Sequence, residues 1–168
     1  MGGEITVSSV KDEGSTFKVR LMLSAVHRPS TAPALEKKIT SYTGPRRTIV
    51  VVDDNEDHRE LMREVLTPMD FVVLTAASGP ECLTLIEGVQ PDIFLVDISM
   101  PGMSGWQLVA RLREMGQTAP IIMLSANIGD GAGNPDGTDG HNDAIAKPVD
   151  IRRLVDKLAV HLGLEWTY

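Results

Sequence analysis

FLVDISMPGMSG, at residues 94–105, is an apolar run that ends in an aspartate, Asp97, and continues into a segment rich in proline and glycine. A short apolar run followed by turn-forming residues is typical of a buried strand that ends in a loop. In parallel α/β sheets, functional groups gather at this carboxyl edge of the strands. Asp97 is therefore the first candidate for a functional residue.

Three other apolar runs also end in polar residues. Strands that run parallel bring their carboxyl ends to one edge of the sheet, so these polar residues are expected to meet Asp97 there. Together they would supply further carboxylates, a hydroxyl and an ammonium group to one site. The residues are Asp53 and Asp54 after the run at 48–52, Ser125 after the run at 120–124, and Lys147 after a short run that precedes Pro148.

Apolar residues recur at helical spacing between these strands, and capping residues stand before three of the helical segments. The capping candidates are Ser78, Ser104 and Asp150. This alternation of strand and helix predicts a parallel sheet covered by helices on both faces. Residues 129–140 interrupt the pattern with five glycines and one proline. Because glycine costs about 1 kcal/mol and proline about 3 kcal/mol inside a helix, we expect a Gly-rich loop there in place of a fourth helix.

The ordered motifs resemble those of the receiver (response-regulator) family, over roughly residues 46–164. The motifs are an acid pair after the first strand, Asp-x-x-x-Pro-Gly after the third, Ser-Ala after the fourth and Lys-Pro after the fifth. The resemblance implies a flavodoxin-like, doubly wound sheet of five parallel strands in the order 2-1-3-4-5. It also implies that Asp97 accepts a phosphoryl group while Ser125 and Lys147 bind phosphoryl oxygens.

Carboxylates alone would repel a phosphoryl donor, so the site calls for a divalent ion. Mg²⁺ suits it as the cofactor because Mg²⁺ prefers oxygen ligands. The resemblance implies that Asp54, Asp97 and the main-chain carbonyl of Ser99 bind Mg²⁺ directly, with Asp53 acting mainly through water. It further implies a cis peptide bond before Pro148.

Each of these residues also has an ordinary structural interpretation. An acid pair such as Asp53-Asp54 is favoured at a helix N-terminus by the helix dipole. Ser125 alone would be a strand-end hydroxyl, and Lys147 alone a solvated charge. His58, in the first turn of a helix, is expected to be an exposed surface residue and not a ligand. The single cysteine, Cys82, is expected to be a small buried hydrophobe.

The chain divides into three predicted parts. Residues 1–24 alternate as a β-hairpin and resemble the last strands of the ATP-binding domain of histidine kinases; an unrelated hairpin is the alternative. Residues 25–46 are rich in proline, serine and threonine and suit a linker. Residues 47–164 form the predicted receiver domain. The kinase boxes that would hold ATP are absent, so the chain itself is not expected to be an enzyme.

Charge and composition limit the partners. Residues 1–47 carry eight Lys or Arg against four Asp or Glu, whereas the remainder carries eight against nineteen. Such an acidic surface disfavours nucleic acid. No apolar run reaches the roughly 20 residues of a membrane span, and a lone cysteine fits a cytoplasmic location. The expected partners are the phosphohistidine domain of a histidine kinase, a histidine phosphotransfer protein and, as a weak association, a second copy of the chain.

The main hypothesis is a phosphoacceptor receiver that takes a phosphoryl group from a phosphohistidine onto Asp97, with Mg²⁺, in the phosphorelay of a hybrid histidine kinase. The alternative is a receiver-fold docking module that regulates a kinase or another partner without being phosphorylated. Ala144 favours this alternative, because signalling receivers usually carry an aromatic residue three positions before the lysine. A hydrolase on a similar fold would need a second acid where Ser99 stands.

Overall fold

The computed structural model of the chain describes residues 3–10, 14–21, 39–126 and 140–168. The chain separates into two units, Met1–Glu36 and Lys37–Tyr168. Residues 22–38, which include most of the predicted linker, lie outside the described residues. So do residues 127–139, and with them the predicted loss of the fourth helix.

The larger unit contains a five-stranded sheet in which every neighbouring pair of strands is parallel. Its spatial order is β5-β4-β6-β7-β8, which is the predicted order 2-1-3-4-5 when the five strands are counted along the chain. The flavodoxin-like prediction is therefore confirmed. The strands are β4 (Thr48–Val52), β5 (Val72–Ala76), β6 (Ile93–Asp97), β7 (Ile121–Ser125) and β8 (Asp143–Ala146).

Four α-helices connect or follow these strands in the described residues, and polar side chains cap them. Ser78 accepts a hydrogen bond from the amide of Glu81, and Ser104 forms a reciprocal capping box with Gln107. Asp150 accepts hydrogen bonds from two amides of the last helix, so all three predicted caps are confirmed. The helices are α1 (Glu56–Leu66), α2 (Gly79–Leu85), α3 (Gly105–Glu114) and α4 (Ile151–Leu162), and a 3-10 turn, η1 (Thr67–Met69), follows α1.

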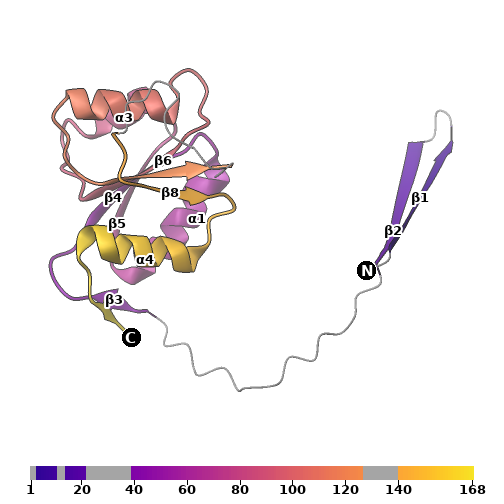
Figure 1. Cartoon of the computed structure of the whole chain (residues 1–168), viewed down its shortest axis with the longest axis horizontal. Coiled ribbons are helices and arrows are strands. Elements are labelled where there is room, and N and C mark those ends of the chain that lie inside the picture. The colour runs from indigo at the N-terminus through magenta and orange to yellow at the C-terminus, as the bar shows by residue number, and fades with distance from the viewer. Residues whose placement is uncertain (1–2, 11–13, 22–38, 127–139) are drawn as a thin grey trace. The chain divides into compact units, whose positions relative to one another are not determined.

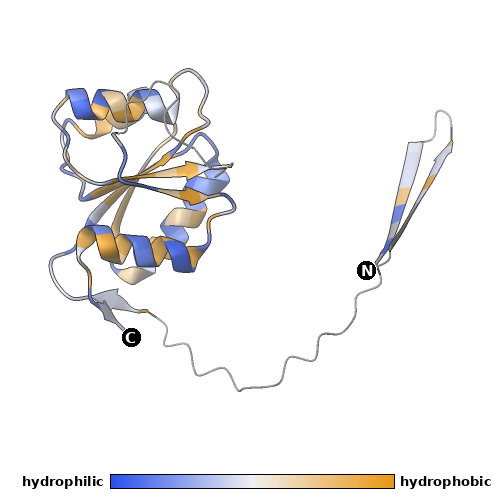
Figure 2. Cartoon of the chain, viewed as in Figure 1, coloured by the Kyte–Doolittle hydropathy of each residue, from blue (hydrophilic) through white to orange (hydrophobic). Residues whose placement is uncertain are grey.

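The sheet lies between two helical layers, with α3 on one face and α4 on the other (Figure 1). Successive side chains of a strand point to opposite faces. β6 and β7 are buried along their whole length, and β4 is buried from its second residue on. Ile49 and Val51 of β4 pack with α1 and α4, whereas Val50 and Val52 pack with α2 and α3. Figure 2 shows the hydrophobic strands between helices whose outer surfaces are hydrophilic. The near-continuous apolar strands are thus explained by burial on both sides.

Cys82 lies on α2 with no exposed surface, as predicted for a small buried hydrophobe. Burial raises the pKa of its thiol to about 12, with a smaller contribution from the charge of Glu81. A thiol held protonated in this way is unreactive at neutral pH.

Two short strands close the end of the domain opposite the carboxyl edge of the sheet. β3 (Ser41–Tyr42) pairs antiparallel with β9 (Trp166–Thr167). The Tyr42 ring lies 4.7 Å from that of Phe71 and 6.1 Å from that of Trp166, between ring centroids. The Tyr42 hydroxyl accepts a hydrogen bond of 2.7 Å from the amide of Arg47. Residues on both sides of the predicted receiver boundaries of 47–164 therefore pack onto this unit.

The smaller unit contains a hairpin of β1 (Gly3–Val10) and β2 (Gly14–Leu21), as predicted. Its strands are antiparallel, and Val7 stands opposite Phe17. Both side chains are exposed, Val7 by 58% and Phe17 by 69%. No helix in the described parts of the two units combines the length and apolar composition needed to cross a membrane.

Candidate phosphoacceptor site

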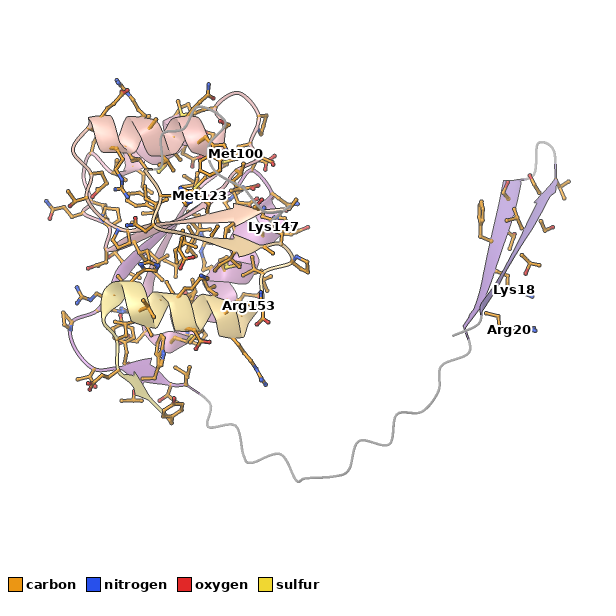
Figure 3. All side chains as sticks on the ribbon, in the orientation of Figure 1. Lys18, Arg20, Met100, Met123, Lys147 and Arg153 are labelled. Carbon is orange, nitrogen blue, oxygen red and sulfur yellow. The ribbon has the colours of Figure 1, made fainter. Side chains whose placement is uncertain are left out.

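The ends of three neighbouring strands bring the predicted site residues together. Asp97 is the last residue of β6, Ser125 is the last residue of β7, and Lys147 follows β8 directly. The parallel register pairs Asp97 with Leu124 and Ser125 with Ala146. Lys147 lies at the edge to which the strand arrows point (Figure 3).

Three carboxylates form an acidic cluster at this edge. One oxygen from each of Asp53, Asp54 and Asp97 lies within 4.8 Å of the other two. Asp53 is 1% exposed and Asp97 is 5% exposed, while Asp54 faces solvent. Buried carboxylates are stable only when charges or hydrogen bonds compensate them.

Lys147 supplies this compensation. Its Nζ lies 2.8 Å from Oδ2 of Asp53 and 2.9 Å from Oδ2 of Asp97. Burial by itself would lower the pKa of the ammonium group, but the hydrogen bonds to the two carboxylates outweigh it and hold the pKa of Lys147 above its ordinary value. Lys147 is therefore charged at neutral pH and bridges the two buried acids. The alternative interpretation of Lys147 as a solvated surface charge does not fit a side chain that lies between two buried carboxylates.

The loop after β6 also binds the Asp97 carboxylate. The amide of Ser99 donates a hydrogen bond of 3.1 Å to Oδ1 of Asp97, so its main chain runs beside the acidic cluster. Further on, the amide of Gly105 donates to the carbonyl of Ile98 at 3.0 Å. The start of α3 is thereby held against the main chain that carries Asp97.

Ser125 and Pro148 complete the sheet edge. Ser125 is 6% exposed, and its carbonyl accepts a hydrogen bond of 2.7 Å from the amide of Lys147. The peptide bond between Lys147 and Pro148 is cis, as the resemblance implied. Ala144 lies on β8, and its side chain packs at the margin of the core beneath α3.

Two residues of α1, His58 and Arg59, also contact the acid pair, and the sequence did not indicate either contact. His58 is exposed, as predicted, with 47% of its side chain accessible, yet its Nδ1 lies 3.1 Å from Oδ2 of Asp53 and 3.4 Å from Nζ of Lys147. Arg59 donates from Nη1 to the main-chain carbonyls of Asp53 at 2.7 Å and Asp54 at 3.0 Å. α1 begins at Glu56, two residues after the acid pair, so its first turn lies close to the pair, but the sequence does not reveal which of its side chains point toward it.

The donor set fits a small hard cation. The cluster offers carboxylate oxygens from three residues, and Mg²⁺ prefers such oxygens and keeps some of its waters. The exposed side of Asp54 leaves room for those waters. A positive ion and Lys147 together would form a site for an anionic group such as a phosphoryl group.

Residues 49–159 match the family model of the response regulator receiver domain. The uncharacterized 14.6 kDa protein in the sodA1 3'region of Leptolyngbya boryana is 37% identical over 109 residues, which cover 64% of this chain and 83% of that protein. The sensor histidine kinase RcsC of Salmonella typhi is 30% identical over 132 residues, 79% of this chain and 14% of RcsC. The sensor protein EvgS of Escherichia coli strain K12 is 27% identical over 164 residues, 97% of this chain and 13% of EvgS. The chain thus spans a small fraction of the length of these two sensor proteins.

Solved structures with the same fold include a CheY-like response regulator receiver domain protein from Methanospirillum hungatei JF-1. It has a TM-score of 0.62 at 28% identity, and the match covers 69% of this chain and 94% of that one. The response regulator TrrA from Thermotoga maritima, crystallised in complex with Mg²⁺-BeF, has a TM-score of 0.62 at 28% identity. That match covers 69% of this chain and 99% of TrrA.

Proposed function

The chain belongs to the response regulator receiver family, and from this premise we propose that Asp97 accepts a phosphoryl group from a phosphohistidine in a Mg²⁺-dependent reaction. The observation that carries the proposal is the position of Lys147, whose ammonium group bridges the buried carboxylates of Asp53 and Asp97. An ammonium group held there neutralises charge where an incoming phosphoryl group would bring more. The two-component receivers to which the chain is homologous include those of the sensor proteins RcsC and EvgS.

In the proposed transfer, a carboxylate oxygen of Asp97 attacks the phosphorus atom. The bond between phosphorus and the donor imidazole nitrogen breaks, and the imidazole keeps the electron pair. Lys147 exchanges its contact with Asp97 for one with a phosphoryl oxygen, which a flexible point charge can do. The hydroxyl of Ser125, at the end of the neighbouring strand, binds another phosphoryl oxygen. The product is an aspartyl phosphate.

Asp53, Asp54, Asp97 and the carbonyl of Ser99 would hold the Mg²⁺, with Asp53 acting mainly through water. The bound ion supplies charge neutralisation for the phosphoryl oxygens. Arg59 fixes the main chain of the acid pair, and the Ser99 amide orients the Asp97 carboxylate, so this chain holds the oxygen ligands in place before the ion binds.

We further propose that residues 1–24 are the last strands of a kinase ATP-binding domain. Two observations support this origin. The match to EvgS covers 97% of the chain and so extends into the hairpin. The exposed pair Val7 and Phe17 gives the hairpin an apolar surface of the kind that packs on a larger domain. The parent protein would then be a hybrid histidine kinase with a cytoplasmic receiver, 47–164, that exchanges phosphoryl groups with phosphohistidine domains.

The alternative, a docking module that works without phosphorylation, is favoured by Ala144. Ala144 has no aromatic ring that could rearrange on phosphorylation, so this chain lacks one common means of signalling through β8. The complete set of acids, hydroxyl and lysine favours the phosphoacceptor.

Transfer from a phosphorylated histidine phosphotransfer domain tests the proposal. The chain is mixed with the labelled domain and Mg²⁺, and the label on each protein is followed by intact mass. We expect label on the wild type and on Asp156→Asn, which removes an exposed aspartate of α4, but none on Asp97→Asn. Label on Asp97→Asn would contradict Asp97 as the acceptor. A folded wild type that gains no label from any of several such domains would favour the docking module.

A further inference from the structure

His58 of α1 contacts two groups of the phosphoacceptor site through one ring nitrogen. Its Nδ1 lies 3.2 Å from Oδ1 and 3.1 Å from Oδ2 of Asp53, and 3.4 Å from Nζ of Lys147. The side chain is 47% exposed, so packing alone does not force it into this position. The transfer proposed above gives His58 no part.

The direction of the hydrogen bond follows from the charge that faces Nδ1. A ring nitrogen of histidine either carries a hydrogen and donates or presents a lone pair and accepts. A lone pair at Nδ1 would face both oxygens of a carboxylate at 3.1–3.2 Å, which is repulsive, whereas an Nδ1–H group attracts them. His58 therefore donates to Asp53. This holds whether or not Nε2 also carries a proton, so the contact does not depend on the charge of the ring.

The hydrogen bonds of the Asp53 carboxylate show what this donor contributes. Oδ1 accepts from the amide of Asn55 at 2.9 Å, and Oδ2 accepts from Lys147 at 2.8 Å. An ammonium group that follows an incoming phosphoryl group moves away from Oδ2. Among the residues that the structure describes, His58 is then the donor that remains there. Asp53 is 1% exposed, and a buried carboxylate oxygen without a donor is costly.

We propose that His58 is a positioning residue that holds the Asp53 carboxylate in place while Lys147 moves to the phosphoryl group. The inference rests on the proposed function, because it takes Asp97 as the acceptor. It goes further by giving an exposed residue of α1 control over the rate of transfer. A carboxylate that keeps its orientation keeps an oxygen in the acidic cluster, and Lys147 leaves it without stranding a buried charge.

Phosphorylation by phosphoramidate tests the effect on the rate. This donor has a bond between phosphorus and nitrogen that breaks with ammonia as the leaving group, and it has no organic part that could contact α1. The rate constant at saturating Mg²⁺ is measured by intact mass for the wild type and His58→Leu. We expect His58→Leu to react about tenfold more slowly, because it loses a hydrogen bond to a charged group. An equal rate would overturn the inference, whereas a wild type that is not phosphorylated would contradict the proposed function itself.

His58→Asn separates the hydrogen-bond donor from the ring. The side-chain amide of asparagine can place an N–H group near the position of Nδ1. This variant should therefore react within about threefold of the wild type, since it keeps a donor for Asp53. If His58→Asn is as slow as His58→Leu, the ring itself is responsible, and the inference is wrong.

Leu61→Ala is the matched control for the surface around His58. Leu61 lies on the same helix, has 47% of its surface exposed, and lines the same pocket of about 420 Å³ as His58. Its side chain has no hydrogen-bonding group, so Leu61→Ala should keep the wild-type rate. A loss as large as that of His58→Leu would show that the wall of the pocket sets the rate, and would contradict the role of the hydrogen bond.

Two measurements on the unphosphorylated chain complete the test. Lys147 still holds Asp53 in this state, so His58→Leu should change the Mg²⁺ affinity, measured by calorimetry, by less than about threefold. Nitrogen NMR of the His58 ring should show a hydrogen on Nδ1. An Nδ1 without a hydrogen, or a loss of Mg²⁺ affinity with no loss of rate at saturating Mg²⁺, would overturn the inference.

Discussion

Nζ of Lys147 lies 2.9 Å from Oδ2 of Asp97, so the residue after β8 contacts the last residue of β6 across the intervening strand β7. The contact joins the proposed acceptor to the group that neutralises its charge. It also makes the two buried carboxylates, Asp53 and Asp97, depend on the ammonium group of Lys147.

Lys147→Met should destabilise the metal-free domain by about 1–3 kcal/mol, because the buried carboxylates of Asp53 and Asp97 lose their counter-charge. Saturating Mg²⁺ should restore more stability to this variant than it adds to the wild type. Urea unfolding with and without Mg²⁺ measures both effects. Lys157→Met, which removes a lysine paired with Asp143 at the start of β8, should not change the response to Mg²⁺. If Mg²⁺ stabilises the wild type and Lys147→Met equally, Lys147 does not supply the counter-charge of the two buried carboxylates.

Gly105→Ala should destabilise the domain by about 3 kcal/mol or more. A Cβ at Gly105 would meet the carbonyl oxygen of Asp97 and the Cα of Ile98, which are main-chain atoms that cannot move aside cheaply. The comparison is Gly88→Ala, since a Cβ at Gly88 meets nothing within 4 Å. Thermal unfolding of both variants checks the prediction, and a stable Gly105→Ala would show that the approach of α3 to β6 is not tight.

Arg113 should contribute more to stability than its neighbour Arg111. The Arg113 guanidinium donates to the carbonyls of Gly140, Gln117 and Ala119 at 2.6–2.9 Å, so Arg113→Met leaves several acceptors unsatisfied, at a cost of about 2–3 kcal/mol. Arg111 is 58% exposed and pairs with Glu114, so Arg111→Met should cost about 0.5 kcal/mol or less. Chemical unfolding compares the two variants, and similar losses would refute the difference.

Asp143 should make the stability of the domain depend on acidic pH. Burial by itself would raise its pKa, but the hydrogen bonds from Lys157 and His161 outweigh it, and the net pKa of Asp143 lies below its ordinary value. A carboxyl whose folded pKa is lowered stabilises the fold above its unfolded pKa, and that stability is lost as the pH falls through the folded pKa.

The wild type should therefore exceed Asp143→Asn in the free energy of unfolding at pH 7. The difference should shrink as the pH falls below about 4, near the ordinary pKa of an aspartate. Urea unfolding across this range measures it. Asp156→Asn, at an exposed position on the same helix as Lys157, should show no comparable change. If the difference in the free energy of unfolding between the wild type and Asp143→Asn stays constant down to pH 3, the ionised Asp143 carboxylate is not its source.

The sequence was sufficient to predict the sheet and the positions of the candidate site residues at its edge, because both follow from strong local signals. The apolar runs that end in polar residues predicted that Asp97, Ser125 and Lys147 lie at the ends of parallel strands. The strand order was implied by the family resemblance. Because three of the residues expected at this edge are aspartates, the sequence also predicted that they would form one acidic site. The contacts between these residues, such as the bridge from Lys147 to both acids, needed the structure.

Other features had no local signal. β3 and β9 have two residues each, too few to show a period, and their pairing depends on rings from Tyr42, Phe71 and Trp166 that are distant in sequence. The contact of His58 with Asp53 depends on the direction of a side chain in the first turn of α1, which periodicity does not reveal.

The most direct test of the central claim is the intact mass of the chain after incubation with acetyl phosphate, with and without Mg²⁺, for the wild type and Asp97→Asn. The account predicts one added phosphoryl group on the wild type only, and only when Mg²⁺ is present. A folded wild type that gains no phosphoryl group in Mg²⁺, or an Asp97→Asn variant that gains one, would contradict it.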